Sequence, residues 1–216
     1  MQAIHELISD IKRKKAYSNT LLVALNIVAF IIMEVAGARE HIGTLLQWGA
    51  GYPPLYEAGE YWRLFTQMFL HGDLEHLINN MLLLYLIGDT LERALGHWKY
   101  MVLYLGAGVG AGILSWHMQM VEGRFYVTLG ASGAVFGVLG ALVCVLVLNR
   151  GRLEGFQIKN LLFMVLLSLY SGFTSSGIDN AAHVGGLMIG FIMTFFLKGI
   201  QIIKVHKGRE NIANED

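Results

Sequence analysis

The chain has 216 residues, of which 55% are hydrophobic and only 15% are charged, and its formal net charge is zero. Soluble domains carry about 25% charged residues, so this composition leaves too few polar side chains to cover a soluble globular fold. Low charge, zero net charge and a single cysteine also exclude a disordered chain, a nucleic-acid-binding protein and a disulfide scaffold. The class that remains is a polytopic integral membrane protein.

Residues 1–18 precede the first apolar stretch and are predicted to form a cytoplasmic amphipathic segment. One helical face carries four apolar side chains, namely Ile4, Leu7, Ile8 and Ile11. Such a face suits a helix on the membrane surface, and a solvent-exposed tail is the alternative. The basic run Lys12–Lys15 and the small residues Ala36–Ala38 also fit a signal peptide, but the apolar run between them is longer than usual. We therefore expect a retained first span.

Six apolar stretches, each bounded by charged or turn residues, predict six transmembrane helices. They run from Thr20 to Ala38, His76 to Leu95, Tyr100 to Met120, Ala131 to Asn149, Asn160 to Ser175 and Ala181 to Leu197. Most match the roughly 20 residues needed to cross a bilayer, and the fifth is short. Because the bilayer core offers backbone groups no water, we expect an all-α, six-helix domain over residues 19–200. Residues 201–216 are predicted to form a cytoplasmic tail.

The lysine and arginine residues predict the orientation of these helices. With a cytoplasmic N-terminus, the inner segments hold thirteen of them: Lys12, Arg13, Lys14, Lys15, Arg93, Lys99, Arg150, Arg152, Lys159, Lys198, Lys204, Lys207 and Arg209. The outer segments hold only Arg39, Arg63 and Arg124. This positive-inside bias predicts a multi-pass protein of the plasma membrane with both termini in the cytoplasm. The long outer loop from Arg39 to Glu75 is rich in aromatic residues, so we expect it to lie among lipid headgroups or to pack on the bundle.

Polar residues interrupt the apolar stretches at three places, and such residues are costly inside a bilayer. His76 and Asn80 lie four residues apart on one face of the second stretch, Ser132 begins the fourth, and His183 begins the sixth. At about 1.5 Å per helical residue, His76, Ser132 and His183 lie about 25, 27 and 22 Å from the first inner charge of their own helices. All three therefore fall at a similar depth, a little below the outer surface, which favours one shared site.

The chemistry of this cluster predicts acyl transfer. A serine hydroxyl becomes a nucleophile when a neighbouring imidazole accepts its proton, which assigns Ser132 and His183 as a catalytic pair. Ser132 begins a helix whose free N–H groups favour an oxyanion, and His76 and Asn80 are further donors to that charge. No aspartate is placed to orient His183, so we expect a dyad rather than a triad.

Each of these residues also has a structural interpretation. Ser132 alone is typical of close helix packing, His183 alone of a hydrogen-bonded structural histidine, and His76 with Asn80 of an interhelical clamp. The shared depth and the glycines that follow Ser132 and His183 favour a site, because small residues let two helices approach closely. Gly133, Gly137 and Gly140 follow the serine, and Gly186 and Gly190 follow the histidine.

Two other patterns are weaker. Gly130–Ala134 is not a G-x-S-x-G elbow, because residue 134 is alanine and no strand precedes it. Gly106–Ala111 matches the loose dinucleotide-binding pattern, but it lies in an apolar span rather than in a βαβ unit. Metal binding by His71, His76 and His183 is a weak alternative, since only Asp73 and Glu75 lie nearby. We therefore expect no metal site.

From Trp62 onward the chain resembles the rhomboid family of intramembrane serine proteases. The resemblance is carried by Trp62-Arg63, by His76 and Asn80 as an H-x₃-N motif, by Gly130–Gly133 as G-x-S-G, and by Ala182–Gly190 as A-H-x-x-G-x-x-x-G. It implies a six-helix core, Ser132 as nucleophile, His183 as base, and His76 and Asn80 as oxyanion donors. Phe136 stands where many members carry a tyrosine that stacks on the base; its ring keeps the stack and loses a hydroxyl contact.

The resemblance implies an endopeptidase that cleaves single-span transmembrane substrates within the lipid bilayer, with no cofactor and no nucleic-acid partner. The alternative is a non-catalytic rhomboid-like protein that binds membrane clients, although such relatives lose the serine or the histidine and this chain retains both. A transporter would show repeats and broken helices at the bilayer midplane, and neither is evident. The substrate and the oligomeric state do not follow from the sequence.

Overall fold

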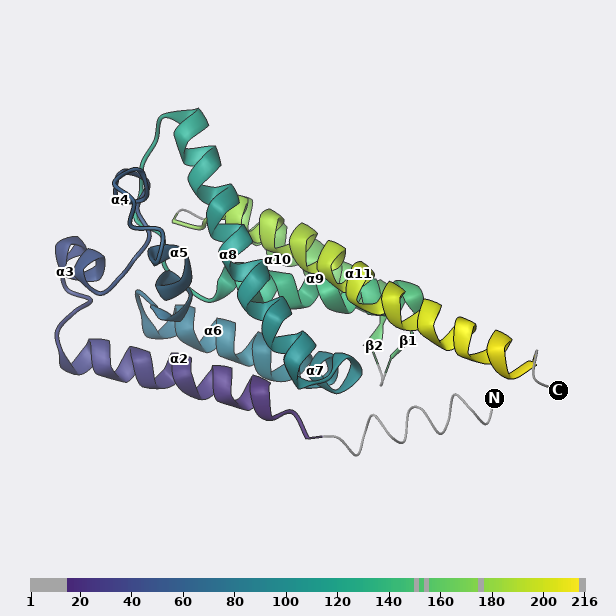
Figure 1. The fold of residues 1–216 in the computed structure, drawn as a ribbon. Helices are drawn as coiled ribbons and strands as arrows, with labels where there is room; N and C mark the ends of the chain where they lie inside the picture. Colours follow the sequence, from purple (N-terminus) through teal and green to yellow (C-terminus); the bar gives the residue numbers. More distant parts are fainter. Residues whose placement is uncertain (1–14, 150–151, 154–155, 175–176, 214–216) are drawn as a thin grey trace.

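The computed structural model describes residues 15–149, 152–153, 156–174 and 177–213 of the chain. Helices dominate this part of the chain and pack side by side into a bundle (Figure 1). In chain order they are α2 (Tyr17–Val35), α3 (Ile42–Gln47), α4 (Pro53–Glu57), α5 (Arg63–Thr66), η1 (Gln67–Phe69), α6 (Leu74–Leu83), η2 (Leu84–Gly88), α7 (Asp89–Leu95), α8 (His97–Glu122), α9 (Ser132–Leu148), α10 (Ile158–Thr174) and α11 (Asn180–Ala213). The predicted amphipathic segment lies almost entirely outside the described residues, and the predicted C-terminal tail continues α11 as far as Ala213.

The six predicted apolar stretches all coincide with helical structure. Within the described ranges, α2, α8 and residues Asn180–Lys198 of α11 are long and apolar enough to cross a membrane, whereas α9 and α10 are apolar but shorter. The expectation of an all-α chain is wrong in one detail, because β1 (Arg152–Leu153) and β2 (Phe156–Gln157) form a short antiparallel hairpin between α9 and α10.

The second predicted stretch is not one uniform α-helix, because α6 passes into the π-helical segment η2 before α7 begins. A π-helical turn leaves the backbone without its usual i→i−4 bonds, so a carbonyl needs another donor. Asn19 of α2 supplies it: its Nδ2 donates to the Leu84 carbonyl at 3.1 Å, while its Oδ1 accepts a bond of 2.6 Å from the Tyr100 hydroxyl. The π-helical segment is therefore stabilised by two neighbouring helices.

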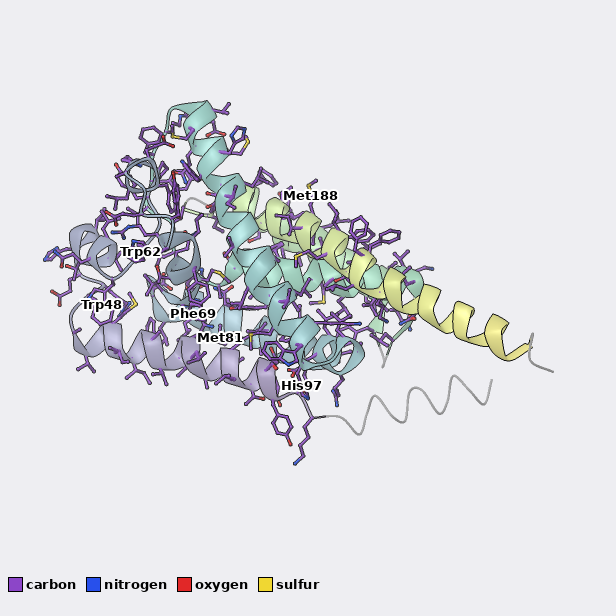
Figure 2. All side chains as sticks on the ribbon, viewed as in Figure 1. Trp48, Trp62, Phe69, Met81, His97 and Met188 are labelled. Atoms are coloured by element: carbon purple, nitrogen blue, oxygen red, sulfur yellow. The ribbon has the colours of Figure 1, made fainter. Side chains whose placement is uncertain are left out.

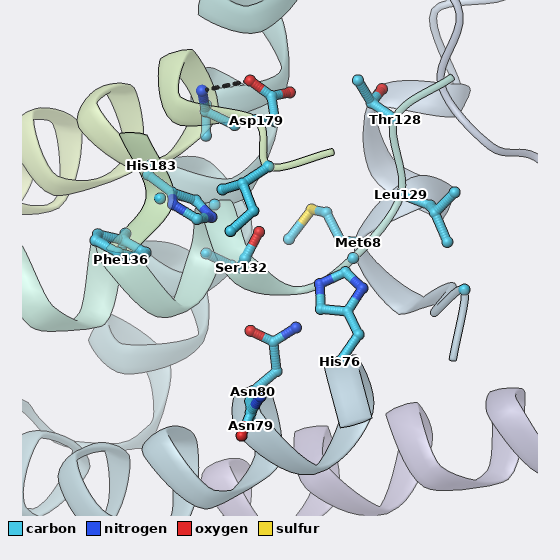
Figure 3. Close-up of a pocket in the computed structure, with 18 of the residues that line it drawn as sticks. Met68, His76, Asn79, Asn80, Thr128, Leu129, Ser132, Phe136, Asp179 and His183 are labelled. Atoms are coloured by element: carbon cyan, nitrogen blue, oxygen red, sulfur yellow. Dashed lines mark hydrogen bonds between the residues drawn. The ribbon is translucent and has the colours of Figure 1, made fainter. Parts of the chain in front are cut away.

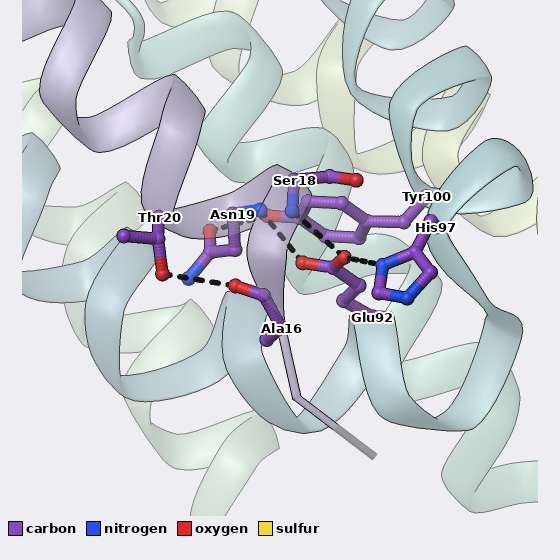
Figure 4. Close-up of polar contacts among 7 residues, drawn as sticks. All are labelled: Ala16, Ser18, Asn19, Thr20, Glu92, His97 and Tyr100. Carbon is purple, nitrogen blue, oxygen red and sulfur yellow. Dashed lines mark hydrogen bonds and ion pairs between the residues drawn. The ribbon is translucent and has the colours of Figure 1, made fainter.

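Glu92 of α7 forms a second polar junction beside it, at the end of α2 where that helix begins (Figure 4). Its buried carboxylate accepts the backbone N–H groups of Ser18 at 2.9 Å and Asn19 at 2.6 Å, and it also contacts the His97 ring. These N–H groups belong to the first turn of α2, which has no carbonyl to receive them. Glu92 thus fixes α2 to α7.

The centre of the bundle is the contact of α11 with α9 and α8. Glycines make this contact possible, because α9 and α11 approach until backbone meets backbone. A Cβ at Gly186 would collide with the Gly133 carbonyl, and one at Gly190 would collide with the Gly137 carbonyl. The prediction that small residues bring the two helices together is confirmed.

The loop from Arg39 to Glu75 folds back on the bundle through α3, α4, α5 and η1, which gather at one end of the long helices (Figure 1). Arg63 is buried and donates from Nη1 to the carbonyls of Leu46 and Ala50, and Gly51 pairs through its backbone with Thr128. Trp48 and Trp62 extend from this region (Figure 2) and are partly exposed. Of the two alternatives expected for this loop, the structure shows packing on the bundle, where α4 and α5 contact α8.

Candidate active site

A cavity of about 960 Å³ lies at the end of the bundle where α6, α9 and α11 meet. Its walls come from α6, α10, the start of α11, the start of α9 and the loop 126–130 that precedes α9. The four predicted site residues, Ser132, His183, His76 and Asn80, all line it. Figure 3 shows Ser132 between the His183 ring on one side and His76 with Asn80 on the other. The structure therefore brings together residues from three helices that the sequence separates by up to 107 positions, from His76 to His183.

Ser132 is the first residue of α9, and the chain reaches it through a constrained turn. Gly130 has a φ of +123°, a backbone conformation that L-amino-acid side chains rarely adopt, and a Cβ there would collide with the His76 ring. The Gly130 N–H donates to the Gln67 carbonyl at 2.9 Å, which fixes the turn to η1. This geometry leaves the first N–H groups of α9 without carbonyl partners beside the serine hydroxyl.

His183 lies in the first turns of α11, is 9% exposed, and stacks on Phe136. The two ring centroids are 4.1 Å apart and the ring planes differ by 11°. Phe136 follows Ser132 by one helical turn, so the same helix carries the serine and the surface on which the imidazole rests. The predicted stacking of Phe136 on His183 is confirmed.

No aspartate was expected to orient His183, and the structure agrees, although Asp179 lies close by in sequence and supports the helix that carries the histidine. Asp179 precedes α11 and accepts the Ala182 N–H at 2.9 Å through Oδ1, as an N-cap residue does. Burial raises the pKa of the Asp179 carboxyl above its usual range. In the described part of the chain, however, nothing hydrogen-bonds to His183 Nδ1, so Asp179 does not orient the ring directly.

His71, expected from the sequence only as a weak candidate metal ligand, has a different role in the structure. It is fully buried, and its Nε2 lies 3.2 Å from Asn80 Nδ2 and 3.4 Å from the backbone nitrogen of Ala131. Both partners are N–H donors, so Nε2 accepts and the proton of the neutral ring is on Nδ1. His71 thus joins Asn80 to the residue just before Ser132. Its position in a loop before α6 gave no helical spacing from which to find it.

The His71 and His76 rings meet edge to face, with centroids 5.1 Å apart. Asp73 caps the N-terminus of α6, which carries His76, because Asp73 Oδ1 accepts the backbone N–H of His76 at 2.7 Å. Since Asn80 and Ala131 occupy His71 Nε2, that nitrogen is not free to bind a metal. Across the residues that the structure describes, no three His, Cys, Asp or Glu side chains converge as metal ligands.

Comparison with known proteins places the chain in a family. The model of the rhomboid domain matches residues 58–199, a range that contains every residue of the site described above. The chain is 37% identical over 171 residues to the rhomboid protease GluP of Bacillus subtilis (strain 168) and 34% identical over 196 residues to the rhomboid protease AarA of Providencia stuartii. It is also 38% identical over 158 residues to RHOMBOID-like protein 5 of Arabidopsis thaliana. The chain belongs to the rhomboid family.

These matches cover much of this chain and differing shares of the relatives. They span 79% of this chain and 33% of GluP, 80% and 69% for AarA, and 72% and 50% for the Arabidopsis protein. The chain therefore spans less than two thirds of two of these three relatives. Membership of a membrane-protein family and the apolar helices together identify a multi-pass membrane protein.

Proposed function

We propose that the chain is an intramembrane serine endopeptidase that cleaves single-span transmembrane substrates through a Ser132–His183 dyad. The observation that carries this proposal is the convergence of Ser132, His183, His76 and Asn80 on one cavity. Two of the similar proteins are named rhomboid proteases, which supports the same class of reaction. The volume of about 960 Å³ is large enough for several residues of an extended peptide.

In the first step the Ser132 Oγ attacks the carbonyl carbon of the scissile peptide bond and its proton passes to His183. His183 Nδ1 is buried and without a partner in the described residues, so we assign proton transfer to Nε2. The C–N bond of the tetrahedral intermediate then breaks, and the leaving amine takes the proton from His183. Water attacks the acyl-enzyme with His183 again as base, which releases the acid and restores Ser132.

The negative charge of each tetrahedral intermediate needs donors that are already in place. The side chains of His76 and Asn80 lie on the side of Ser132 away from His183 (Figure 3), and the backbone N–H of Ser132 at the start of α9 is a further donor. The buried His71 ring fixes Asn80, and Gly130 lets the His76 ring approach the turn before α9. Donors held in this way require little reorganisation when the charge develops.

We further propose that the protein lies in the plasma membrane and crosses it six times. Both of its termini then lie in the cytoplasm. The positive-inside distribution of lysine and arginine supports this orientation. It places the cavity near the outer surface, where a transmembrane substrate would present a segment just inside the bilayer.

The test is cleavage of a single-span transmembrane reporter by the purified protein in liposomes, compared with Ser132→Ala and His183→Ala. We expect the wild type to cleave and both variants to fall to background at unchanged thermal midpoint, because neither can form the acyl-enzyme. Equal cleavage by Ser132→Ala would exclude the assignment. A folded wild type that binds the reporter without cleaving it would favour a non-catalytic client-binding protein.

A further inference from the structure

Four hydrogen bonds run in series from the loop before α9 to the first turn of α11. The Tyr126 N–H donates to Gln119 Oε1 at 2.8 Å, and Gln119 Nε2 donates to Ser115 Oγ at 3.2 Å. The Ser115 hydroxyl donates to Asp179 Oδ2, and the Ala182 N–H donates to Asp179 Oδ1 at 2.9 Å. Both carboxylate oxygens of Asp179 are therefore occupied, one by α8 and one by α11.

The middle of this series is shielded from water, since Ser115 and Gln119 of α8 are 2% and 1% exposed. Hydrogen bonds in such surroundings hold their geometry, because breaking them leaves a buried polar group without a partner. The two ends of the series adjoin the site. Tyr126 begins the part of the loop that lines the cavity on the way to Ser132, and Asp179 precedes His183 by one helical turn.

Asp179 also acts on the backbone of His183, whose N–H donates to the Asp179 carbonyl at 3.1 Å. Asp179 thus holds the first turn of α11 through its side chain at Ala182 and through its main chain at His183. On the other side of this turn, Asn180 Nδ2 donates to the Gly172 carbonyl of α10 at 3.0 Å.

We propose that Asp179 is a positioning residue for His183, and that with Ser115 it sets where the imidazole stands relative to Ser132. This inference rests on the proposed function, in which His183 is the base. Asp179 acts through the backbone of α11 rather than as a third member of a triad, because its oxygens are engaged by Ser115 and Ala182. The His183 ring itself rests on Phe136.

The expected effect is on turnover. Asp179→Ala removes the two carboxylate oxygens that accept from Ser115 and Ala182, so the start of α11 can shift against α8. A misplacement of a reacting group by about 1 Å can cost about 100-fold in rate. We expect kcat to fall about 10- to 100-fold with KM changed by less than about threefold, since the cavity walls formed by α6 and the loop 126–130 stay in place. Asp179→Asn retains an acceptor for Ala182 and a polar partner for Ser115, and should keep kcat within about threefold of wild type.

Ser115→Ala breaks only the link to α8 and should give a smaller loss than Asp179→Ala. The double variant Ser115→Ala with Asp179→Ala should be no slower than Asp179→Ala, because both changes remove one connection. Tyr100→Phe is the matched control: it removes a buried hydrogen bond, that of Tyr100 to Asn19, at the opposite end of the bundle. It should lower the thermal midpoint without lowering kcat.

The experiment measures kcat, KM and thermal midpoint for these variants on one transmembrane reporter. It also records the imidazole ¹⁵N resonances of His183, assigned by their loss in His183→Gln. The inference predicts that these resonances move in Asp179→Ala and Ser115→Ala, and stay near wild type in Asp179→Asn and Tyr100→Phe. Unchanged kcat in Asp179→Ala, failure of Asp179→Asn to restore it, or unmoved His183 resonances would each overturn the inference. A wild type without cleavage would refute the proposed function, and the resonances would still decide the position of His183.

Discussion

His71, His76 and Asn80 form a connected set at one wall of the cavity, and two of them are proposed to stabilise the oxyanion. Asn80 is 5% exposed and is held by His71, while His76 faces the turn at Gly130. If His76 and Asn80 only clamped helices, their removal would lower stability and would affect turnover only as far as folding failed. If they donate to the oxyanion, the loss is in turnover, because these bonds strengthen in the transition state.

We therefore expect His76→Ala and Asn80→Ala each to reduce kcat by about 10- to 1,000-fold, with the Ser132 N–H remaining as a donor. The double variant should lose less than the product of the single losses, since both residues serve one charge. The measurement is turnover and thermal midpoint on the same detergent preparation. Normal turnover in the double variant would exclude the role, and losses that follow the thermal midpoint would favour helix packing.

The pH dependence of stability gives a separate test of His71. Burial, together with the nearby His76, lowers the pKa of His71 to about 3, against about 6.5 in an unfolded chain. Below about pH 6.5 the unfolded chain therefore binds a proton that the folded chain does not, so this contribution to stability is present above that pH and is lost as the pH falls toward 3. The structural reason for the lowered pKa is that protonation would place a hydrogen on Nε2, which already faces two N–H donors.

The prediction is that the thermal midpoint of the wild type falls more steeply between pH 7.5 and 5 than that of His71→Asn. Because both proteins share all other titrating groups, the difference between the two slopes removes the contribution of those groups to the pH dependence of the thermal midpoint. Parallel slopes would show that His71 does not titrate in this way.

At this scale the sequence predicted four residues that all line the cavity, because each is a polar group in an apolar stretch at a computable depth. It missed Asp179 as a support of His183 and His71 as a support of Asn80. Both lie in loops, where helical spacing gives no information about neighbours. The Asp179-Asn180 pair before an apolar run was nevertheless a readable N-cap signal.

Among the elements, α9 and α11 matter most, since they carry the serine and the histidine. Their glycines place backbone against backbone, and this contact sets the distance between the two side chains proposed to be catalytic. A Cβ at Gly190 would collide with the Gly137 carbonyl, which cannot move without moving α9. At Gly106 of α8 the collision would be with the end of the flexible Met193 side chain instead.

Gly190→Ala should therefore destabilise the fold by about 1–3 kcal/mol and reduce turnover beyond that, because α9 and α11 must separate. Gly106→Ala is the matched control and should leave turnover near wild type, since Met193 can adopt another rotamer. Thermal midpoint and reporter cleavage for both variants provide the comparison. Equal effects of the two substitutions would contradict the close-contact account.

The elements that sequence periodicity predicted best are those with long apolar runs, and the boundaries of α2, α8, α9 and α10 lie within a few residues of the predicted stretches. The π-helical segment Leu84–Gly88 was not predictable, because it depends on Asn19 and Tyr100 from two other helices. The hairpin of β1 and β2 was missed for a similar reason: two residues per strand are too few to show an alternating pattern.

For the molecule as a whole, the proposed topology puts the loop after α8 outside and the hairpin after α9 inside. The chain has one cysteine, Cys144, which is buried, so Cys144→Ser provides a background for single-cysteine labelling. Arg124 and Gln157 are both exposed positions, one in each of these loops. In intact cells a membrane-impermeant maleimide should label Arg124→Cys and spare Gln157→Cys until the cells are opened. The reverse pattern would overturn the orientation.

The proposed activity depends on His183, which activates Ser132 as a nucleophile. The most direct measurement is covalent labelling of the folded protein by a fluorophosphonate probe, with the modified residue located by mass spectrometry. We predict one adduct, on Ser132, that is lost in Ser132→Ala and reduced to background in His183→Ala at unchanged thermal midpoint. Failure of the folded wild type to react, or equal labelling in His183→Ala, would contradict the account.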